Sequence, residues 1–455
     1  SVTRLLNVLG SRGVPFSTNT VPTDRLTDNV SLLGRLDWTP SPTMVGNVVG
    51  SVRHNVARAS FLGATAVPGH GGDLRTNGGD VTGTFSAYLP NNYLNDLRVG
   101  AHVNSTNGDP YVGLPDIRVL VSSQFADSTT GNSTLQFGGN AALPRVARTR
   151  GVEVYDMLSW FTLDRLHRFR LTADLRADGF SQEQYPNRRG IYTFNSIADV
   201  ESNRPATFSR VLSGQRASAN ALTGSLSFGD DWRPGQRSQL QYGVRIDAND
   251  FLDRPAYNAA VESRFGGRTD FVPRLIDVSP RIGFFRAFGT NGSTGIPGFG
   301  APWGNVRGGV GLFRNDVAQT LVAPAMLATG LPGGVQQIGC IGAAVPIPDW
   351  SVFLNDPSAI PTRCADTSAA SPFIATRPNV WMIDRHFAAQ QSWRTNLALN
   401  AFLVPKLIRF TVEGVYSLNL HQQAVTDLNF APNTRFALAN EGNRPVFALP
   451  SSIVP

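Results

Sequence analysis

Lysine is nearly absent from this sequence, because Lys406 is the only lysine among 40 basic residues. Arginine therefore carries almost all of the positive charge, against 33 acidic residues. The arginines are spread singly through alternating segments, and no basic run or basic helix of the kind that follows a phosphate backbone is present. This distribution argues against a nucleic-acid partner and favours single arginines on a polar surface.

Long apolar runs are also missing. No stretch approaches the roughly eighteen apolar residues that a membrane-spanning helix needs. Hydrophobic residues make up 41% of the 455 residues, which argues against disorder. A spanning β-barrel stays compatible with this composition, because each strand needs only about ten residues and half of them can be polar.

Motifs that carry chemistry are scarce. The six histidines are dispersed without metal-ligand spacing, and Ser-x-x-Lys, Gly-x-Ser-x-Gly and His-Glu patterns are absent. The glycine-rich segments do not lead from a strand into a helix, as a phosphate-binding loop would. We therefore expect no enzyme activity, no metal and no cofactor. The first residues also lack the charged segment and apolar core of a signal peptide.

Strict alternation of apolar and polar residues is what the sequence does contain. In the segment 237–247, Leu240, Tyr242, Val244 and Ile246 alternate with Gln239, Gln241, Arg245 and Asp247. A period of two predicts a strand with one apolar and one polar face. The apolar face would pack on a second sheet in a soluble sandwich, and would meet lipid in a membrane barrel whose polar face lines a lumen. One strand does not decide between the two.

About fourteen strands in seven hairpins are expected. The paired halves are 32–38 with 44–53, 81–89 with 97–103, 118–125 with 133–138, 152–161 with 169–175, 222–228 with 237–247, 278–286 with 306–313, and 393–403 with 408–418. Residues 1–28 are expected to form a loop. The connections between hairpins are long, at 54–80, 177–214, 250–277, 314–392 and 419–455. Short turns that alternate with long loops, and an even number of strands, are typical of outer-membrane barrels.

Aromatic residues lie near several of these strand ends, where a barrel carries a girdle at each membrane interface. They are Trp38, Tyr93, Trp160, Trp232, Trp393 and Phe402. Aromatic residues also favour strands in general, so the girdle remains one of two explanations.

Three segments resemble TonB-dependent outer-membrane receptors of the Oar-like group. They are the strand Tyr242–Asp247, the loop Arg254–Asn258 and the strand Val278–Phe284. Further similar pieces are Leu32–Trp38, Ser392–Asn396 and Asn443–Phe447. The resemblance covers strands and loops over most of the chain, and it does not indicate the cargo.

The resemblance implies an antiparallel transmembrane β-barrel of twenty-two strands in the bacterial cell outer membrane, plugged by an N-terminal domain that the TonB complex drives. Neither a plug nor a TonB box is found in the sequence, and the segment Ser451–Pro455 lacks a closing strand with a terminal aromatic residue. We therefore expect residues 1–455 to be part of the barrel domain, with 314–392 as a long extracellular loop. The expected partners are outer-membrane lipid, the TonB complex through the missing plug, and an unidentified solute.

Charged residues on the polar faces of the strands are expected to point into the lumen. They are Arg168, Arg170, Asp174, Arg176, Arg245, Asp247, Arg281, Arg307, Arg394, Arg409 and Glu413. Their role is either structural, as cross-strand charge pairs and contacts with a plug, or functional, in guiding a polar or anionic solute. Cys340 and Cys364 are expected to form a disulfide that closes a surface loop, because an exported chain can oxidise them.

The sequence thus favours an outer-membrane TonB-dependent transporter that binds a solute at its outer face and admits it to the periplasm. One alternative is a passive porin or a structural or adhesive outer-membrane barrel. A second alternative is a secreted soluble β-rich binding module or glycan hydrolase.

Overall fold

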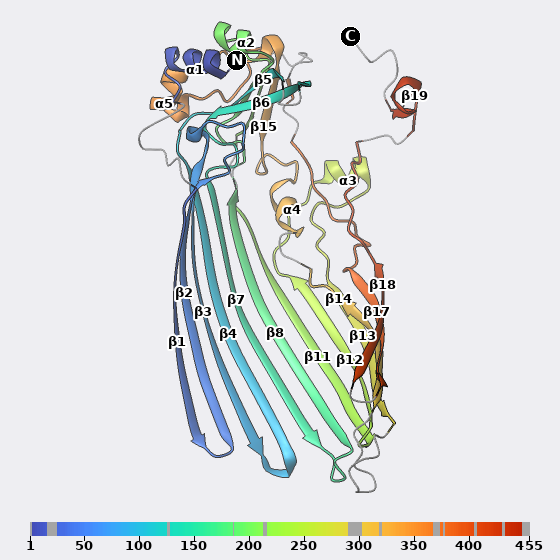
Figure 1. Cartoon of the computed structure of the whole chain (residues 1–455). Helices are drawn as coiled ribbons and strands as arrows, with labels where there is room; N and C mark the ends of the chain where they lie inside the picture. The colour runs from blue at the N-terminus through green and yellow to red at the C-terminus, as the bar shows by residue number, and fades with distance from the viewer. Residues whose placement is uncertain are drawn as a thin grey trace.

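A computed structural model describes residues 2–15, 25–124, 128–184, 186–212, 216–289, 303–317, 321–366, 374–375, 378–404, 407–429 and 433–447. Most of this chain forms one tall, curved antiparallel sheet, and a smaller sheet with three helices lies over one end of it (Figure 1). We call the tall sheet the wall and the smaller assembly the cap.

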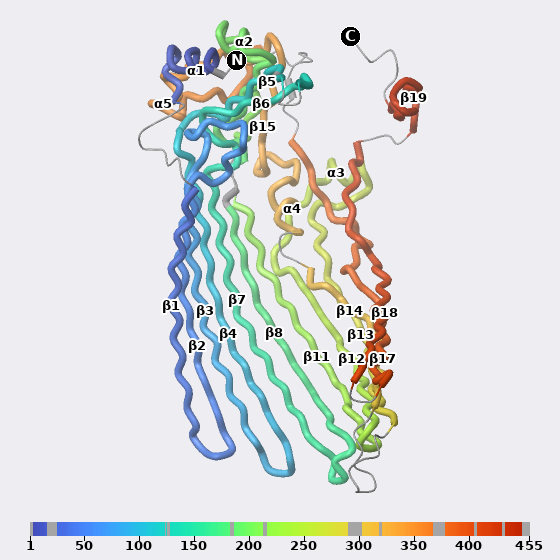
Figure 2. Tube along the Cα trace, viewed as in Figure 1, coloured from blue at the N-terminus to red at the C-terminus, as the bar shows by residue number. Residues whose placement is uncertain are grey.

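The wall contains twelve strands, and each strand pairs with the next wall strand along the chain. They are β1 (Thr27–Ser41), β2 (Met44–Ser60), β3 (Gly72–Leu89), β4 (Tyr93–Pro110), β7 (Arg145–Phe161), β8 (His167–Gln184), β11 (Ala217–Gly235), β12 (Ser238–Phe251), β13 (Leu275–Phe288), β14 (Gly304–Arg314), β17 (Gln391–Val404) and β18 (Ile408–Leu420). The long side-by-side strands are visible as near-parallel traces in Figure 2.

The wall strands are longer than alternation alone predicts, at up to 19 residues in β11. About ten residues are enough for a strand to cross a membrane, and these strands are longer than that. The extra residues lie at the end away from the short turns, where segments such as Ser105–Pro110 are polar on both faces but still pair in register with β3. Backbone pairing continues there without the apolar alternation that marks a membrane strand.

Short turns join the wall strands at one end, as expected. Ser41 pairs with Met44 across the first turn, and Gly235 pairs with Ser238 across another. In the turn after β3, Asn91 and Asn92 both have φ of 62°. Two successive left-handed residues are what a tight hairpin turn requires, and asparagine tolerates that conformation better than most residues. Pro405 and Lys406, in the last predicted turn, lie outside the described residues.

The third predicted hairpin is not part of the wall, so the wall has twelve strands where fourteen strands in all were expected. Its two halves, β5 (Asp116–Gln124) and β6 (Thr130–Gly138), pair with each other in the cap. Ile117 and Val119 alternate with polar residues as wall strands do, but they are fully buried against other cap elements. Alternation therefore identified β5 and β6 as strands, but it did not predict that they pack against segments from distant parts of the chain.

The cap sheet is assembled from three separate connections of the wall. Its order is β16-β15-β10-β9-β5-β6. The strands besides β5 and β6 are β9 (Ile191–Phe194), β10 (Thr207–Val211), β15 (Gln337–Ile341) and β16 (Ile374–Ala375), and the cap helices are α1 (Val2–Ser11), α2 (Ile197–Ser202) and α5 (Trp350–Asn355). β5 and β9 are parallel, while the other pairs in this sheet are antiparallel.

The expectation of a loop over residues 1–28 is wrong for its first part, which forms α1. Leu5 and Leu9 are one helical turn apart and are almost completely buried in the core of the cap. The apolar core that they join also contains Tyr192 and Phe208, whose rings stack with centroids 4.3 Å apart. The helix is short, and its stability comes from this packing, which the sequence alone did not reveal.

The remaining elements are short. They are α3 (Ala259–Phe265), α4 (Ala323–Leu327), β19 (Phe436–Leu438), β20 (Arg444–Val446) and the 3-10 helices η1 (Pro68–His70), η2 (Pro90–Asn92), η4 (Gly342–Ala344), η5 (Pro357–Ala359) and η6 (Ala439–Glu441). Among the described residues, the outer edges of β1 and β18 have no paired strand, so the wall is a curved, open sheet.

Candidate functional site

The eleven residues predicted to line a lumen share one face of the wall. Directly paired residues of an antiparallel sheet point to the same side, so the register can be followed from strand to strand. Asp174, for example, pairs with Ser225, which pairs in turn with Asp247. The face that they share, called the charged face, carries Arg168, Arg170, Asp174, Arg176, Arg245, Asp247, Arg281, Arg307, Arg394, Arg409 and Glu413.

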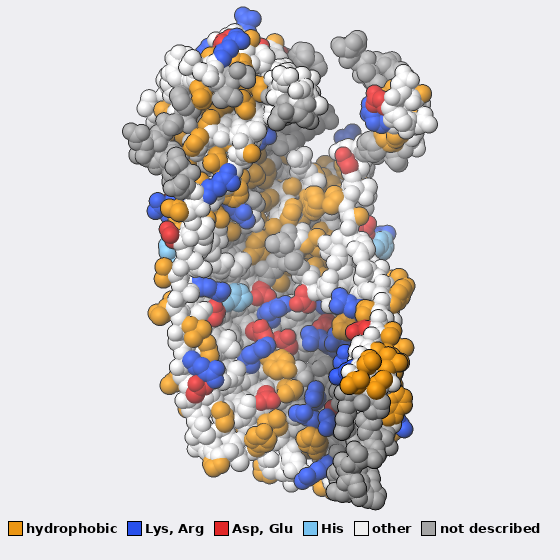
Figure 3. All heavy atoms as spheres, viewed as in Figure 1, with side chains coloured by type: hydrophobic (Ala, Val, Ile, Leu, Met, Phe, Trp, Pro, Cys, Tyr) orange, Lys and Arg blue, Asp and Glu red, His pale blue; other side chains and the backbone are white. Residues whose placement is uncertain are grey.

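The charged face is the concave side of the wall. Figure 3 shows positive and negative side chains gathered in the hollow, with apolar side chains along the outer margins. Helix α4 also lies inside the curve (Figure 1), where Ala323 packs against Ala217 and Ala219 of β11. These alanines belong to the charged face. Ala221 lies two residues beyond Ala219 on the same side of β11, and it pairs with Asp178 on the charged face of β8.

The opposite face is apolar and exposed. Large side chains such as Leu175, Leu226, Ile282 and Val412 are each about half exposed, although they are hydrophobic. A soluble protein rarely leaves so continuous an apolar surface uncovered, whereas a bilayer supplies the apolar surroundings that it needs. Asn95 and Asp156 interrupt this face, and they satisfy each other through a hydrogen bond of 2.7 Å.

An aromatic cluster marks the turn end of the apolar face. Tyr93 stacks on Trp160, Trp160 contacts Phe169 and Phe228, and His167 stacks between Phe169 and Trp232, with ring centroids 5.5 to 6.4 Å apart. Such a band is typical of a membrane interface. Phe402 does not belong to it, because it pairs with Arg409 on the charged face.

The apolar band above this cluster has the height of a membrane. On β7, apolar-face residues run from Trp160 to Val152, and Arg150 and Arg148 follow on the same face. Nine residues of a strand span about 30 Å, and less along the membrane normal when the strand is tilted. This agrees with the band of about 25 Å that outer-membrane barrels present to lipid.

Ion pairs occupy the charged face from β1 to β12. They join Arg35 to Asp37 (2.7 Å), Arg53 to Asp80 (3.0 Å), Arg98 to Glu153 (2.6 Å), Arg176 to Asp178 (2.9 Å) and Arg245 to Asp247 (2.8 Å). The first three pairs were missed as site residues, although the same alternation could have placed them. Partly exposed pairs contribute only about 0–1 kcal/mol each, so they order the charged face more than they stabilise the wall.

Both arms of the connection between β14 and β17 fold back into the hollow. This connection spans 315–390, within the predicted bounds of 314–392. Val317 and Val322 on its first arm and Ala389 at its end form one apolar cluster with Ala221 and Phe251 of the wall. The arms of the connection therefore narrow the upper part of the hollow.

One ion pair anchors the first arm to the wall, and a second joins two wall strands directly before the arm begins. Asp316 accepts a hydrogen bond from Arg176 of β8 at 2.8 Å, and Arg314 contacts Asp277 of β13 at 2.7 Å. Below the arm, a cavity of about 300 Å³ is bordered by Arg176, Asp316 and Thr223, among other residues. One predicted residue, Arg176, is thus brought together with a loop residue, Asp316, that the sequence did not single out.

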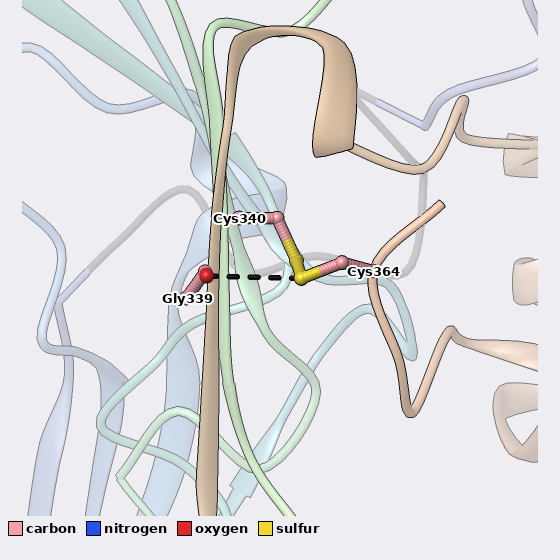
Figure 4. The surroundings of a disulfide bond; sticks show 3 residues. All are labelled: Gly339, Cys340 and Cys364. Atoms are coloured by element: carbon pink, nitrogen blue, oxygen red, sulfur yellow. Dashed lines mark hydrogen bonds between the residues drawn. A yellow bond between two sulfur atoms is a disulfide. The ribbon is translucent and has the colours of Figure 1, made fainter. Parts of the chain in front are cut away.

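Cys340 and Cys364 are joined by a disulfide inside the cap, with their Cα atoms 5.7 Å apart. Figure 4 shows the bond linking β15 to the segment after η5, with the Cys364 Sγ 3.7 Å from the Gly339 carbonyl oxygen. Both cysteines are buried in the apolar core of the cap. The bond therefore joins β15 to another segment of the cap, and it lies below the surface of the cap.

The junction between cap and wall contains two polar groups, the partly buried Tyr111 and the buried His70. Tyr111 donates a hydrogen bond to Asp73 (2.5 Å) and accepts one from the Ala59 backbone N–H (2.7 Å). Burial and the Asp73 carboxylate raise the pKa of Tyr111 to about 12. His70 is 2% exposed, and burial lowers its pKa from the usual value even though Asp116 lies near.

The described residues contain no group of His, Cys, Asp and Glu side chains arranged to hold a metal ion. In the same part of the chain, no helix has the length and apolarity required to cross a bilayer.

Comparison with known proteins gives one family and a set of distant structures. The family model for outer membrane beta barrel domains matches residues 3–453. No curated protein matches the sequence. Similar solved structures include the outer membrane transporter YddB from Escherichia coli, at 10% identity over 83% of this chain and 38% of that one, with a TM-score of 0.47.

Two further similar structures are receptors. The siderophore receptor PirA from Pseudomonas aeruginosa is 11% identical over 82% of this chain and 43% of its own, with a TM-score of 0.39. The ferric preacinetobactin receptor BauA from Acinetobacter baumannii is 9% identical over 92% and 58%, with a TM-score of 0.40. The chain thus spans less than two thirds of each of these three proteins.

The family match covers almost the whole chain, and it agrees with the two-faced wall, its aromatic band and its short turns. It is also the reason to retain the expectation that the protein is not an enzyme, since the match is to a membrane barrel. The chain belongs to the family of outer membrane beta barrel domains and resides in the bacterial outer membrane.

Proposed function

We propose that this chain is the barrel portion of a TonB-dependent transporter that binds a solute at its extracellular side and admits it to the periplasm. The observation that carries the proposal is the connection 315–390, whose arms pack into the hollow while its middle part builds the cap. A wall that is covered and narrowed in this way suits a gated receptor better than a freely open channel.

The resemblance to Oar-like receptors supports the same function. Its segments Tyr242–Asp247 and Val278–Phe284 lie on adjacent strands, β12 and β13, which pair in register. Under this proposal, a plug domain and the TonB complex are the partners that open the passage, and outer-membrane lipid surrounds the apolar face. Residues 315–390 lie at the end with long connections, which faces outward in outer-membrane barrels.

A passive porin is the competing function, and the charged hollow favours it. The two functions differ in their need for energy. The solute is first identified as one whose uptake is lost when this gene is deleted. Its uptake in the native cell should also stop when TonB is deleted or the proton gradient is collapsed. Uptake that continues in the TonB-deleted cells at the parental rate would establish a passive channel and refute the transporter.

A further inference from the structure

Phe313 on the charged face is held between two arginines. The guanidinium carbon of Arg281 lies 4.3 Å from the centre of its ring, and that of Arg394 lies 5.2 Å from it. The two arginines come from β13 and β17, on either side of β14, which carries Phe313. A ring that contacts two cations holds both charges in one place on the wall.

A glycine leaves the space in which Arg281 and Phe313 pack together. Gly311 lies between the two arginines in the same row, because it pairs with Arg281 on one side and Arg394 on the other. A Cβ atom at Gly311 would lie 2.9 Å from Arg281 Cγ and 3.2 Å from Phe313 Cε2. The next position across from Arg281 is also glycine, Gly243, so no neighbouring side chain in this row covers the Arg281 guanidinium.

Neither of the two arginines has a described acidic partner. Among the described residues, no carboxylate lies within 4 Å of Arg281 or Arg394, whereas Arg98 and Arg245 each contact one. The only polar contact described for Arg394 is a hydrogen bond of 3.3 Å from its Nε to Ser392 Oγ. Both guanidinium groups are exposed to the hollow, so their positive charge is available to a ligand.

We propose that Arg281, Arg394 and Phe313 form a binding site for an oxyanion on the inner surface of the barrel. Guanidinium groups bind carboxylate and phosphate through paired, charge-assisted hydrogen bonds, and the ring fixes their position in advance. Two such groups around one ring fit a small polycarboxylate or phosphate-bearing solute. The site rests on the proposed function, and it specifies that the transported solute is anionic.

The site lies where such a solute would pass. Asn315 and Gln390, which join the two ends of the connection through a backbone hydrogen bond of 2.9 Å, directly follow β14 and precede β17. Gly311 of β14 and Arg394 of β17, which are level with Arg281, lie three to four residues further along these strands, toward the turns. An anion that clears the arms of the connection therefore meets these arginines next.

The test is calorimetric titration of the purified full chain in detergent with citrate and, separately, with inorganic phosphate at low salt. We expect at least one of the two anions to bind, with affinity that falls as NaCl is added. The double substitution Arg281→Gln and Arg394→Gln should weaken binding at least about tenfold. Phe313→Leu keeps both charges and should still weaken binding about threefold, because the arginines lose their support.

Arg409→Gln is the matched control. Arg409 lies on the same face, over the ring of Phe402 at 6.0 Å, and it also lacks a described acidic partner. Its substitution removes the same charge from the same surface and should change the affinity less than about twofold. Heat-modifiable migration on gels verifies that each variant is folded. If the double glutamine variant fails to fold, the pair Arg281→Lys and Arg394→Lys replaces it and should lose about threefold, because lysine lacks the paired donors.

Two results would overturn the site. One is that neither anion binds the wild-type protein, and the other is that Arg409→Gln weakens binding as much as the double variant, which would indicate a diffuse positive surface. These measurements need no transport. A protein that binds citrate through Arg281 and Arg394 but shows energy-independent uptake would retain the site and lose the TonB-dependent function.

Discussion

At the scale of single residues, the two faces of β8 differ in the solvent that they meet. Leu175 is on the apolar face near the middle of the band, while Leu171 pairs with Leu158, one residue pair away from the aromatic cluster. Arginine costs about 2–4 kcal/mol at the midplane of a bilayer and about 0–1 kcal/mol near its interfaces. We therefore expect Leu175→Arg to lower the free energy of unfolding in lipid vesicles by about 2–4 kcal/mol, and Leu171→Arg to lower it less.

Thr172→Arg is the control for this series. Thr172 pairs with Ser227 and Met157 on the charged face, next to Arg170 and Asp174. An arginine there would extend into the hollow and should leave the free energy of unfolding nearly unchanged. Equal losses for Leu175→Arg and Thr172→Arg in denaturant titrations would contradict the assignment of the two faces.

His70 gives the junction between cap and wall a pH dependence. Burial lowers its pKa in the folded protein, while in the unfolded chain the pKa is about 6.5. The unfolded state therefore binds the proton more readily, so stability is complete above about pH 6.5 and decreases as the pH falls below that value. We expect amide exchange in the segment 68–71 to accelerate between pH 7.5 and pH 5 after correction for intrinsic rates. His70→Gln cannot take up this proton and should flatten the change.

At the scale of elements, the first arm of the connection 315–390 depends on its anchor. Asp316→Asn removes the negative charge that faces Arg176, and a partly exposed pair contributes about 0–1 kcal/mol. We expect amide exchange in residues 321–335 to increase by up to about fivefold, because local opening becomes easier. Asp384→Asn is the control, since the hydrogen bonds described for the Asp384 side chain are with His386 alone and its loss should leave the arm unchanged.

The disulfide acts on the cap alone. Replacing Cys340 and Cys364 by alanine opens a loop closed over 24 residues, which costs about 3 kcal/mol in the chain-entropy model. We expect the cap to become sensitive to protease, because β15 is held in the core by this bond. The wall should still insert and keep its heat-modifiable migration. Loss of insertion in the double alanine variant would show that the cap is required to build the wall.

The elements also show what the sequence could reveal. Alternation located β8 and β12 with their faces, since lipid and the hollow impose a strict period of two on such strands. The same pattern misassigned β5, because Ile117 and Val119 meet a cap core made from remote segments, and no local signal reports that. The short helix α1 was missed for the same reason. The eleven charged residues share one face of the wall, but Phe313 was not identified, because its contacts depend on two strands that lie on either side of it.

At the scale of the whole molecule, the wall predicts the behaviour of a membrane barrel. Protein extracted from outer membranes should need detergent to stay in solution. In gels it should migrate differently before and after boiling, because a paired sheet resists the detergent until it is heated. A protein that dissolves without detergent and shows a single mobility would contradict the exposed apolar face as a lipid-facing surface.

The open edges of the wall are a feature of the same scale. Every residue of β1 from Thr27 to Pro40 is exposed, and β18 is exposed along most of its length. Unpaired backbone groups are too costly to leave in the hydrocarbon part of a bilayer. In the membrane, both edges must therefore be paired, either with each other or with strands beyond those described.

The cap can form only late in folding, because its strands come from three separate connections of the wall. Because β5 and β6 belong to one connection, β9 and β10 to the next but one, and β15 to a third, the cap cannot close until β14 and the chain beyond it have been produced. Until then, the core around Ile117, Val119 and Phe137 lacks the side chains that β15 and α5 contribute, such as Cys340 and Trp350. The disulfide between Cys340 and Cys364 can consequently serve as a late marker of folding. Chains in which it is buried in the cap core have already formed the other strands of that core.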